Sequence, residues 1–428
     1  MRKLLSCISV IGLAALSLTA CGEKAPSYSN VGTEITIWAT EKEEAVIKAV
    51  VEKYNANQKE ESSKFKYNFK GVTEADAGTT LAKDPTVEGR PALFLCADDH
   101  IFNLQSKGIV AELKGSYKEH VVANNSAVAV KGATYNDKLY GFPVTSDNGY
   151  FLWYNKAALS DNDVKSLETV LQKAKDSKKT FGMEINNGWY ANSFIMSPQA
   201  CGTSSLTWAA NAEGKVSYTT TWDNEAGVKV SEYANSLIKP LYEAGTFVTA
   251  TNEVILQGFQ DGSMIAAVSG TWMESDLKKA IGDNLAAVKL PEYHIDGKAY
   301  QMASFTGSKI YCINTSCTVE EQKAAAALAE LLTNADSQLI RYENRQAIPC
   351  NKEAAADKRF TENTTISAKA LEAQNAAAAC VQSQTAQDRY WDIGKAIGQA
   401  YLDGNLGEGV TTWAQFLKAQ MDILRTAQ

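Results

Sequence analysis

The stretch LYGFPVTSDNGYFLWYNK, residues 139–156, decides the fold of this chain. Gly141 is conformationally permissive, and Pro143 has a fixed φ and no amide donor, so the two mark a local break. Residues 150–154, YFLWY, are aromatic and apolar and predict a buried strand. The short polar residues TSDN at 145–148 lie between these features. We expect the chain to cross here from one lobe to another, beside a ligand cleft; the simpler alternative is a strand that enters a core after a turn.

Strand and helix patterns alternate along the rest of the chain. Residues 34–39, 65–72 and 91–96 predict strands, and residues 41–55 carry apolar side chains at helical spacing. After the crossing, the same reasoning predicts strands at 181–187, 264–268 and 303–314 and helices at 224–244, 319–333 and 385–402. This alternation predicts an α/β fold with mainly parallel sheets, in which ligands bind beyond the carboxyl ends of the strands.

Length and composition limit the class of protein. A chain of 428 residues suffices for two or three domains, and 45% apolar with 21% charged residues is typical of a globular protein. The net charge of −7 argues against a nucleic-acid-binding protein, which would need a basic face. The 3 histidines leave little room for a histidine-rich metal site. We expect neither a metal nor a cofactor.

The N-terminus has the order of a bacterial lipoprotein signal. A basic start, MRK, is followed by an apolar run at 4–18 and by Leu-Thr-Ala-Cys, which ends at Cys21. In such signals the cysteine is acylated, for example with palmitate, and becomes the mature N-terminus. A transmembrane anchor is the weaker alternative, because the run falls short of about 20 residues and contains serines. We therefore expect a signal peptide at 1–21, a flexible tether at 22–33, and lipid anchoring to the cell membrane on its extracytoplasmic face.

Six cysteines remain once Cys7 of the signal and Cys21 are set aside. They show no CxxC spacing and are scattered through a large chain, so they do not indicate a disulfide scaffold. The sequence leaves open whether they pair. They are Cys96, Cys201, Cys312, Cys317, Cys350 and Cys380.

Charged and aromatic residues follow several predicted strands. Glu41 and Lys42 come after the first strand, and the run ADDH at 97–100 comes after the strand at 91–96. Tryptophans lie near other predicted turns, at positions 189, 272 and 391. A flat ring stacks on the apolar face of a sugar, while carboxylates and amides bind its hydroxyls. The simpler alternatives are tryptophans that fill the core, aspartates that cap a helix and, for Trp391 and Lys395, a plain helix face.

A series of short motifs resembles one family. The motifs are Trp38, LYGFPV at 139–144, LWYNK at 152–156, FQDGSM at 259–264 with GTW at 270–272, and Trp391. Their order, behind a lipoprotein signal, is similar to the extracellular solute-binding proteins of carbohydrate ABC importers, above all the maltose/maltodextrin-binding proteins. The resemblance runs from about residue 34 to the C-terminus.

The resemblance implies the two-lobed, type II periplasmic-binding-protein fold. In this α/β fold each lobe is a mainly parallel sheet flanked by helices, and the lobes close on a sugar by hinge motion. Lobe 1 is expected to contain residues 34–144 and 303–348, and lobe 2 residues 145–302 and 349–428. The return crossings are then expected near residues 302 and 348.

The resemblance also implies sugar contacts in the first lobe. Glu41 and Lys42 match an acid–base pair after the first strand, and Asp99 matches an aspartate of a strand-end loop. His100 stands where maltose binders usually have arginine, and Cys96 where they often have tryptophan. These departures favour a shifted glycan preference, with an α-glucan as the first expectation.

Further contacts are implied at the crossing and in the second lobe. Asp147 matches an acidic residue just past the crossing, and either Trp189 or Tyr190 matches an aromatic of the second lobe. Trp272 and Trp391 match two stacking platforms, and Lys395 replaces an arginine one helical turn further on. The candidate ligand-binding residues are Glu41, Lys42, Asp98, Asp99, His100, Asp147, Trp189, Tyr190, Trp272, Trp391 and Lys395.

The sequence is compatible with three functions. The leading hypothesis is a lipid-anchored, monomeric receptor that captures an oligosaccharide and delivers it to a membrane permease without catalysis. A glycan-cleaving enzyme would need two carboxylates across the scissile bond. The adjacent Asp98 and Asp99 diverge, and Glu41 and Asp147 can face each other, but nothing in the sequence marks this pair as a tuned acid and base. A binder of another solute, such as a peptide or a polyamine, is the third alternative, because acid-rich loops suit a cation. Ferric sites in this fold use adjacent tyrosines, and no Tyr-Tyr pair occurs in the sequence.

Overall fold

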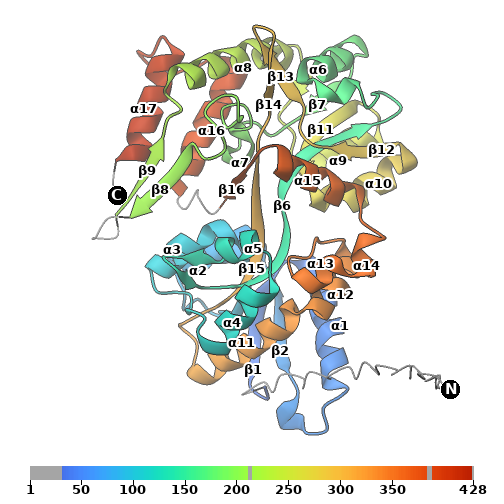
Figure 1. Ribbon diagram of the computed structural model, residues 1–428, viewed down its shortest axis with the longest axis vertical. Helices are drawn as coiled ribbons and strands as arrows, with labels where there is room; N and C mark the ends of the chain where they lie inside the picture. Colours follow the sequence, from blue (N-terminus) through green and yellow to red (C-terminus); the bar gives the residue numbers. More distant parts are fainter. Residues whose placement is uncertain (1–30, 211–214, 383–387, 427–428) are drawn as a thin grey trace, which may run out of the picture.

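The computed structural model describes residues 31–210, 215–382 and 388–426. The expected signal peptide with Cys21, and the expected tether up to residue 30, lie outside the described residues. Figure 1 shows an elongated molecule with an upper and a lower half, joined in the middle by two long strands. These strands are β6 (Phe142–Asn155) and β15 (Ser304–Ile313), which pair antiparallel. The two-lobed α/β fold predicted from the sequence is confirmed.

The crossing stretch is one continuous strand and not a turn followed by a strand. β6 pairs with β15 between Phe142 and Gly149, with β11 (Met264–Gly270) from Tyr150 to Tyr154, and with β12 (Leu285–Val288) from Leu152 to Asn155. The polar residues 145–148 therefore lie inside β6. Gly141, predicted to mark a break, instead allows the backbone to pack closely against β15. A Cβ at this position would come within 3.2 Å of the Ile310 side chain.

The aromatic part of β6 is buried on both faces. Tyr150, Leu152 and Tyr154 belong to the main hydrophobic core, whereas Phe151 and Trp153 belong to a second core. Successive side chains of a strand point to opposite faces, so this division is the one that a strand between two packed layers requires. The predicted buried strand is confirmed.

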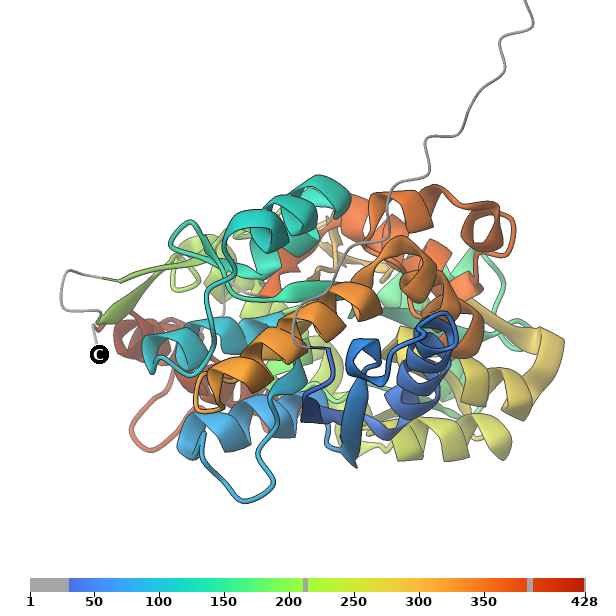
Figure 2. The same cartoon turned by 90° about the horizontal axis from the view of Figure 1, so that it is seen from below.

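The lower half contains the first three strands, which run parallel. β1 (Glu34–Ala39) pairs with β2 (Lys66–Gly71) and with β3 (Leu93–Ala97), and β15 joins β3 antiparallel. Seen from below, α11 and α12 cross this half in orange (Figure 2). A small ladder, β4 (Thr134–Tyr135) with β5 (Lys138–Leu139), lies here too. The helices of this half are α1 (Glu44–Asn55), α2 (Glu74–Lys83), α3 (Ile101–Ser106), α4 (Gly115–Asn124), α5 (Ala127–Gly132), α11 (Val319–Thr333), α12 (Ala335–Arg345), α13 (Lys352–Ala356) and α14 (Lys358–Thr361).

The upper half contains the other end of the sheet. The strand order through both halves is β10-β7-β11-β6-β15-β3-β1-β2, with β12 beside β6 and β16 beside β15. The remaining strands are β7 (Thr180–Gly182), β10 (Phe247–Val248), β16 (Ala379–Val381) and the hairpins β8 (Leu206–Ala210) with β9 (Val216–Thr220) and β13 (Glu292–Ile295) with β14 (Lys298–Gln301). The helices are α6 (Leu167–Asp176), α7 (Gly188–Ala191), α8 (Glu225–Glu243), α9 (Asn252–Gln260), α10 (Glu274–Ile281), α15 (Ile366–Ala377), α16 (Asp388–Asp403) and α17 (Trp413–Arg425).

One predicted strand is much shorter than expected. The strand predicted at 181–187 is β7, which ends at Gly182. The chain then enters α7, because the side chain of Asn187 accepts a hydrogen bond from the Trp189 amide and caps this short helix. The helix predicted at 385–402 is α16, of which residues 385–387 lie outside the described part.

Five of the six cysteines of the described part are buried, and Cys201 is partly exposed. The sulfur atoms of Cys96 and Cys312 lie 3.9 Å apart on neighbouring strands. Burial raises the pKa of Cys350 to about 12 and that of Cys380 to about 12. These two thiols therefore stay protonated at neutral pH and are unreactive.

Candidate ligand-binding site

Two short 3₁₀ turns carry the charged candidates of the lower half. η1 (Glu41–Glu43) follows β1, and η3 (Asp98–His100) follows β3. Because β1, β2 and β3 are parallel, their carboxyl ends lie at one edge of the sheet. The Glu41 side chain lies against Gly71 at the end of β2, where an added Cβ would be 2.7 Å from Glu41 Cγ. The structure thus brings these strand ends together, and both Glu41 and Lys42 are exposed.

Asp98 is buried, unlike its neighbours on η3. It is 2% exposed, and its Oδ2 accepts a hydrogen bond of 2.9 Å from the backbone nitrogen of Ser308 on β15. A Cβ on Gly132 would come within 2.3 Å of the same oxygen, so the glycine makes room for the carboxyl group. Burial, with the nearby charge of Asp99 adding to it, raises the pKa of Asp98 to about 8. Asp98 is therefore mostly protonated at neutral pH.

Asp99 is joined to the crossing strand by side-chain hydrogen bonds. Gln382, directly after β16, donates through Nε2 to Asp99 Oδ1 at 3.1 Å. Asn148 in the polar stretch of β6 donates through Nδ2 to Gln382 Oε1 at 2.7 Å. The neighbouring His100 ring packs against Gly78 of α2, where a Cβ would be 2.4 Å away. The η3 turn is thus fixed both to the crossing and to a lower-half helix.

Asp147 lies in the middle of β6 and is 5% exposed. Its Oδ1 accepts a hydrogen bond of 2.5 Å from the Thr145 hydroxyl, and its backbone oxygen accepts one of 3.2 Å from the Thr271 hydroxyl. Thr271 begins η5 (Thr271–Met273), which carries Trp272. The indole Nε1 of Trp272 donates to Asn252 Oδ1 at 3.1 Å. The η5 turn that carries Trp272 therefore contacts the polar part of β6 through Thr271.

Trp189 and Trp391 form an aromatic cluster with Phe305 of β15. The ring of Trp189 stacks on Phe305 at a centroid distance of 5.1 Å, and the ring of Trp391 meets Phe305 edge-on at 5.8 Å. The two indoles are 6.2 Å apart. Tyr190 also contacts Tyr150, with 4.8 Å between the ring centroids. Trp189 and Trp391 remain partly exposed, whereas Tyr190 is 7% exposed.

Close packing of α7 on α16 holds this cluster. A Cβ on Gly188 would come within 2.6 Å of the Trp391 backbone oxygen, so only glycine allows the two helices to approach this far. Lys395 is exposed on α16, one turn after Trp391. Among the described residues, no ring contact joins Trp272 to the Trp189–Trp391 pair. The aromatic candidates of the upper half thus form two separate groups.

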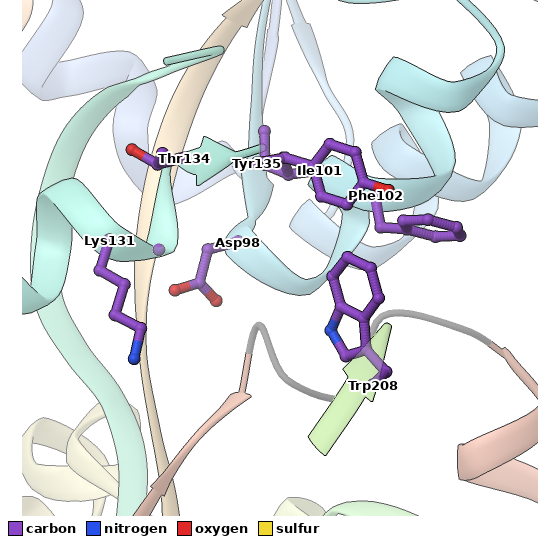
Figure 3. Close-up of a pocket in the computed structure, with 8 residues that line it drawn as sticks. Asp98, Ile101, Phe102, Lys131, Thr134, Tyr135 and Trp208 are labelled. Atoms are coloured by element: carbon purple, nitrogen blue, oxygen red, sulfur yellow. The ribbon is translucent and has the colours of Figure 1, made fainter. Parts of the chain in front are cut away.

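A further contact joins the halves at a place that the sequence did not predict. Trp208 of β8 stacks on Tyr135 of the lower half, with 5.2 Å between ring centroids and 10° between ring planes. It also meets Phe102 edge-on at 5.1 Å. Figure 3 shows these side chains around a cavity of about 140 Å³ that Asp98 and Lys131 also line. Asp98 therefore faces a small cavity between the halves that Glu41 and Lys42 do not line.

Sequence analysis also missed the buried charges at the junction. Lys309 of β15 has a side chain that is 15% exposed, and its Nζ lies 3.5 Å from Glu74 Oε1. Burial lowers the pKa of Lys309, but the carboxylates of Glu74 and Asp147 outweigh this and raise it above its usual value. Glu43 is buried as well and is paired with Arg341. In the sequence, the sign of a buried charge was Lys309 itself, a lysine inside the apolar run at 303–314.

Comparison with protein families gives one match. The sequence model of the family described as bacterial extracellular solute-binding proteins matches residues 49–368, about three quarters of the chain. No curated protein sequence matches the chain.

Several solved structures are similar over nearly their whole length. A chain solved with acarbose is 26% identical, with a TM-score of 0.77 over 92% of this chain and 98% of that chain. The maltodextrin-binding protein MalE1 from L. casei BL23, solved without ligand, is 20% identical, with a TM-score of 0.74 over 92% and 99% of the two chains. MalX from Streptococcus pneumoniae, in complex with maltopentaose, is 20% identical, with a TM-score of 0.71 over 91% and 99%. These chains share the fold described above.

Proposed function

Because the chain belongs to the bacterial extracellular solute-binding proteins, we propose that it is the receptor of an ABC importer that captures a maltodextrin-like oligosaccharide. The family and the two-lobed fold are those that the sequence resemblance implied. Members of this family bind and do not catalyse, so the proposed receptor does no chemistry on its ligand. It delivers the sugar to membrane permease subunits and acts as a monomer.

The Trp189–Trp391 pair beside Phe305 is the observation that carries the proposal. Two partly exposed indoles, held by packing at the end of a crossing strand, offer flat apolar faces of the kind on which sugar rings stack. The relatives solved with acarbose and with maltopentaose support an α-glucan as the ligand class. Stacking of this kind provides affinity, whereas hydrogen bonds to the hydroxyls provide orientation.

The candidate residues then have different roles. The partly exposed candidates Trp189, Trp272 and Trp391 stack on sugar rings, whereas Tyr190 is buried. The polar candidates Glu41, Lys42, Asp99, His100, Asp147 and Lys395 bind hydroxyl groups through charge-assisted hydrogen bonds. Asp98 is the least direct of the set, because its carboxyl group already accepts a bond from Ser308 and faces the cavity beside Trp208.

Closure of the two lobes on the sugar is part of the proposal. The hinge contains β6 and β15. The sequence resemblance predicts lobe 1 at 34–144 and 303–348 and lobe 2 at 145–302 and 349–428. The contacts of α13 and α14 with α12 favour a third crossing after Thr361 over one at residue 349. Wherever this third crossing lies, the segment before it is attached to β6, because the Ser146 nitrogen donates a hydrogen bond of 3.0 Å to the Ile348 oxygen.

Lipid anchoring at Cys21 completes the proposed receptor. In residues 31–210, 215–382 and 388–426, no helix is long and apolar enough to cross a membrane. An acyl chain on Cys21 would hold the protein at the extracytoplasmic face of the cell membrane. Replacement of Cys21 by serine is expected to abolish incorporation of labelled palmitate. Labelling that persists in this variant would contradict the assignment.

A thermal-shift screen against glycans tests the function. A ligand that binds only the folded state at 100 times its Kd adds about 2.7 kcal/mol to the free energy of unfolding and raises the melting temperature. We expect maltotriose and maltotetraose to raise it, and cellotetraose, a β-linked control, to leave it unchanged. A shift with spermidine or a peptide alone would favour the other-solute alternative. Shortened products after incubation with maltotetraose would show a glycan-cleaving enzyme.

A further inference from the structure

A buried ion cluster joins the η1 turn to α12. Glu43, the last residue of η1, is 0% exposed, and Arg341 of α12 is 1% exposed. The Arg341 Nε donates to both carboxylate oxygens of Glu43, at 3.1 Å each. Arg345, one turn further along α12, forms a second ion pair with Glu43. One carboxylate thus pairs with two guanidinium groups inside the lower half. Glu43 and Arg341 are 298 residues apart in the sequence.

This cluster is a costly way to pack two elements. Charges taken out of water lose their hydration, and apolar side chains of similar size often pack with equal or greater stability. Arg341 Nη2 and Arg345 Nε have no hydrogen-bond partner among the described residues. Burial lowers the pKa of Arg345 to about 10, which reflects the same loss of hydration. Stability alone therefore does not explain the cluster, whereas a requirement for one fixed orientation does.

The element that the cluster fixes is weakly held by itself. η1 is a single 3₁₀ turn of 3 residues, and Thr40 before it makes no side-chain cap. Glu43 is the one buried residue of the turn. The other two residues, Glu41 and Lys42, are exposed, and no hydrogen bond or ion pair among the described residues involves either side chain. Within the turn, the buried contacts of Glu43 therefore hold the backbone that carries Glu41 and Lys42.

The other end of the cluster is fixed to the crossing. Arg341 Nη1 donates to the Leu332 oxygen at the end of α11, at 3.1 Å. Gln338, three residues before Arg341 on α12, donates to the Pro143 oxygen of β6 at 3.3 Å and accepts from the Cys350 nitrogen at 2.8 Å. α12 is therefore a rigid support between η1 and the start of β6.

We propose that Glu43 and Arg341 are positioning residues, whose buried ion pair fixes η1 to α12 and so presents Glu41 and Lys42 to the sugar. This inference rests on the proposed function, because it assigns a role toward the same ligand. It adds two residues that contact no sugar themselves.

A double-mutant cycle with Lys42 tests the role. We expect Glu43→Gln to weaken maltotriose binding by about tenfold in calorimetric titration, and Lys42→Ala to do the same. If Glu43 acts through η1, the double variant Glu43→Gln/Lys42→Ala should bind no more than about twofold more weakly than Lys42→Ala alone. Effects that multiply in the double variant, or an unchanged affinity of Glu43→Gln, would overturn the inference.

Lys53→Met is the matched control. Lys53 pairs with Asp336 at 2.5 Å, so this exposed ion pair also joins α1 to α12, at a distance from η1. We expect its maltotriose affinity to equal that of the wild type. If Glu43→Gln does not fold, Arg345→Met replaces it, because Arg345 is partly exposed and Arg341 remains to pair with Glu43. This variant should bind about threefold more weakly, and wild-type affinity would count against the inference.

Hydrogen exchange separates a failure of this inference from a failure of the proposed function. In Glu43→Gln, the backbone amides of residues 42–45 should exchange at least about tenfold faster than in Lys53→Met, whether or not sugar is present. Equal exchange in the two variants would show that Glu43 does not hold the turn. If wild-type protein binds none of the tested sugars, the proposed function is wrong, and the ligand role of Glu43 is wrong with it.

Discussion

The two halves present different chemistry to their junction. The lower half offers Glu41 and Lys42 on a short turn, exposed and without partners among the described residues. The upper half offers Trp189 and Trp391, which are packed against Phe305 and remain only partly exposed. A ring held by its neighbours loses little conformational entropy on binding, whereas a long charged side chain loses more. The comparison suggests that the upper half provides most of the affinity and the lower half most of the orientation.

Replacement of Trp391 by alanine is expected to have the largest effect on this difference between the halves. We expect Trp391→Ala to weaken maltotriose binding at least about tenfold in calorimetric titration, because a stacking face is lost. The melting temperature should also fall, since Trp391 packs against Phe305 and Tyr390. Trp391→Phe keeps a ring and should retain most of the affinity. Equal affinity in the alanine variant and the wild type would remove the stacking role.

Replacement of Trp272 separates affinity from packing. Trp272→Ala should also weaken maltotriose binding at least about tenfold. Its melting temperature should fall less than that of Trp391→Ala, because the Trp272 indole makes no ring contact with the Trp189–Trp391 pair in the described structure. Asn252→Ala is the control, since it removes the hydrogen-bond partner of the indole and leaves the ring. Loss of stability without loss of affinity in Trp272→Ala would make this residue a core residue.

The lower half contains one carboxyl group, that of Asp98, whose pKa is raised by burial. The pKa of Asp98 is about 8 in the folded protein and near 3.9 in an unfolded chain. Between these values the folded state holds a proton that the unfolded state has released, so the contribution of Asp98 to stability falls as the pH rises from about 4 to about 8. Above that range both states are ionised and the loss is complete.

Asp98→Asn should remove this dependence. The free energy of unfolding of the variant relative to the wild type is expected to increase by up to about 1.4 kcal/mol per pH unit between pH 4 and pH 8. Urea unfolding at pH 5, 6, 7 and 8 measures it. Asp99→Asn should itself reduce the dependence in part, because the charge of Asp99 adds to the raised pKa of Asp98. A constant difference across this range would show that Asp98 ionises normally.

The smallest effect is expected at the exposed end of the upper half. Lys395 is exposed one turn after Trp391, and an exposed charge adds little to binding. Lys395→Ala should weaken maltotriose binding by less than about threefold, and high salt should reduce the difference further. A tenfold loss would show that the upper half also orients the ligand through charge, which would blur the contrast between the halves.

The sequence predicted the features that depend on neighbours along the chain. The aromatic run at 150–154 was predicted as a buried strand, and the charged turns after β1 and β3 were predicted to share a sheet edge, because parallel strands end on the same side. The polar residues 145–148 were expected to mark the crossing between the lobes. They do lie on the strand that joins the two halves, but inside the continuous strand β6 and not in a turn.

The features that were missed depend on residues far apart in sequence. The burial of Asp98 requires the small space beside Gly132 and the amide of Ser308, neither of which a local pattern indicates. The Glu43–Arg341 pair spans 298 positions, so no pattern of neighbouring residues links its two members. The stacking of Trp208 on Tyr135 depends on how a hairpin of one half reaches the other.

A crystal structure of the complex with maltotetraose tests the central claim most directly. We expect sugar rings stacked on Trp391 and Trp272, with hydroxyl groups within hydrogen-bond distance of Glu41 and Lys42. The two halves should then contact the same ligand, one through rings and the other through charges. A sugar bound away from these residues, or no sugar at saturating concentration, would contradict the account.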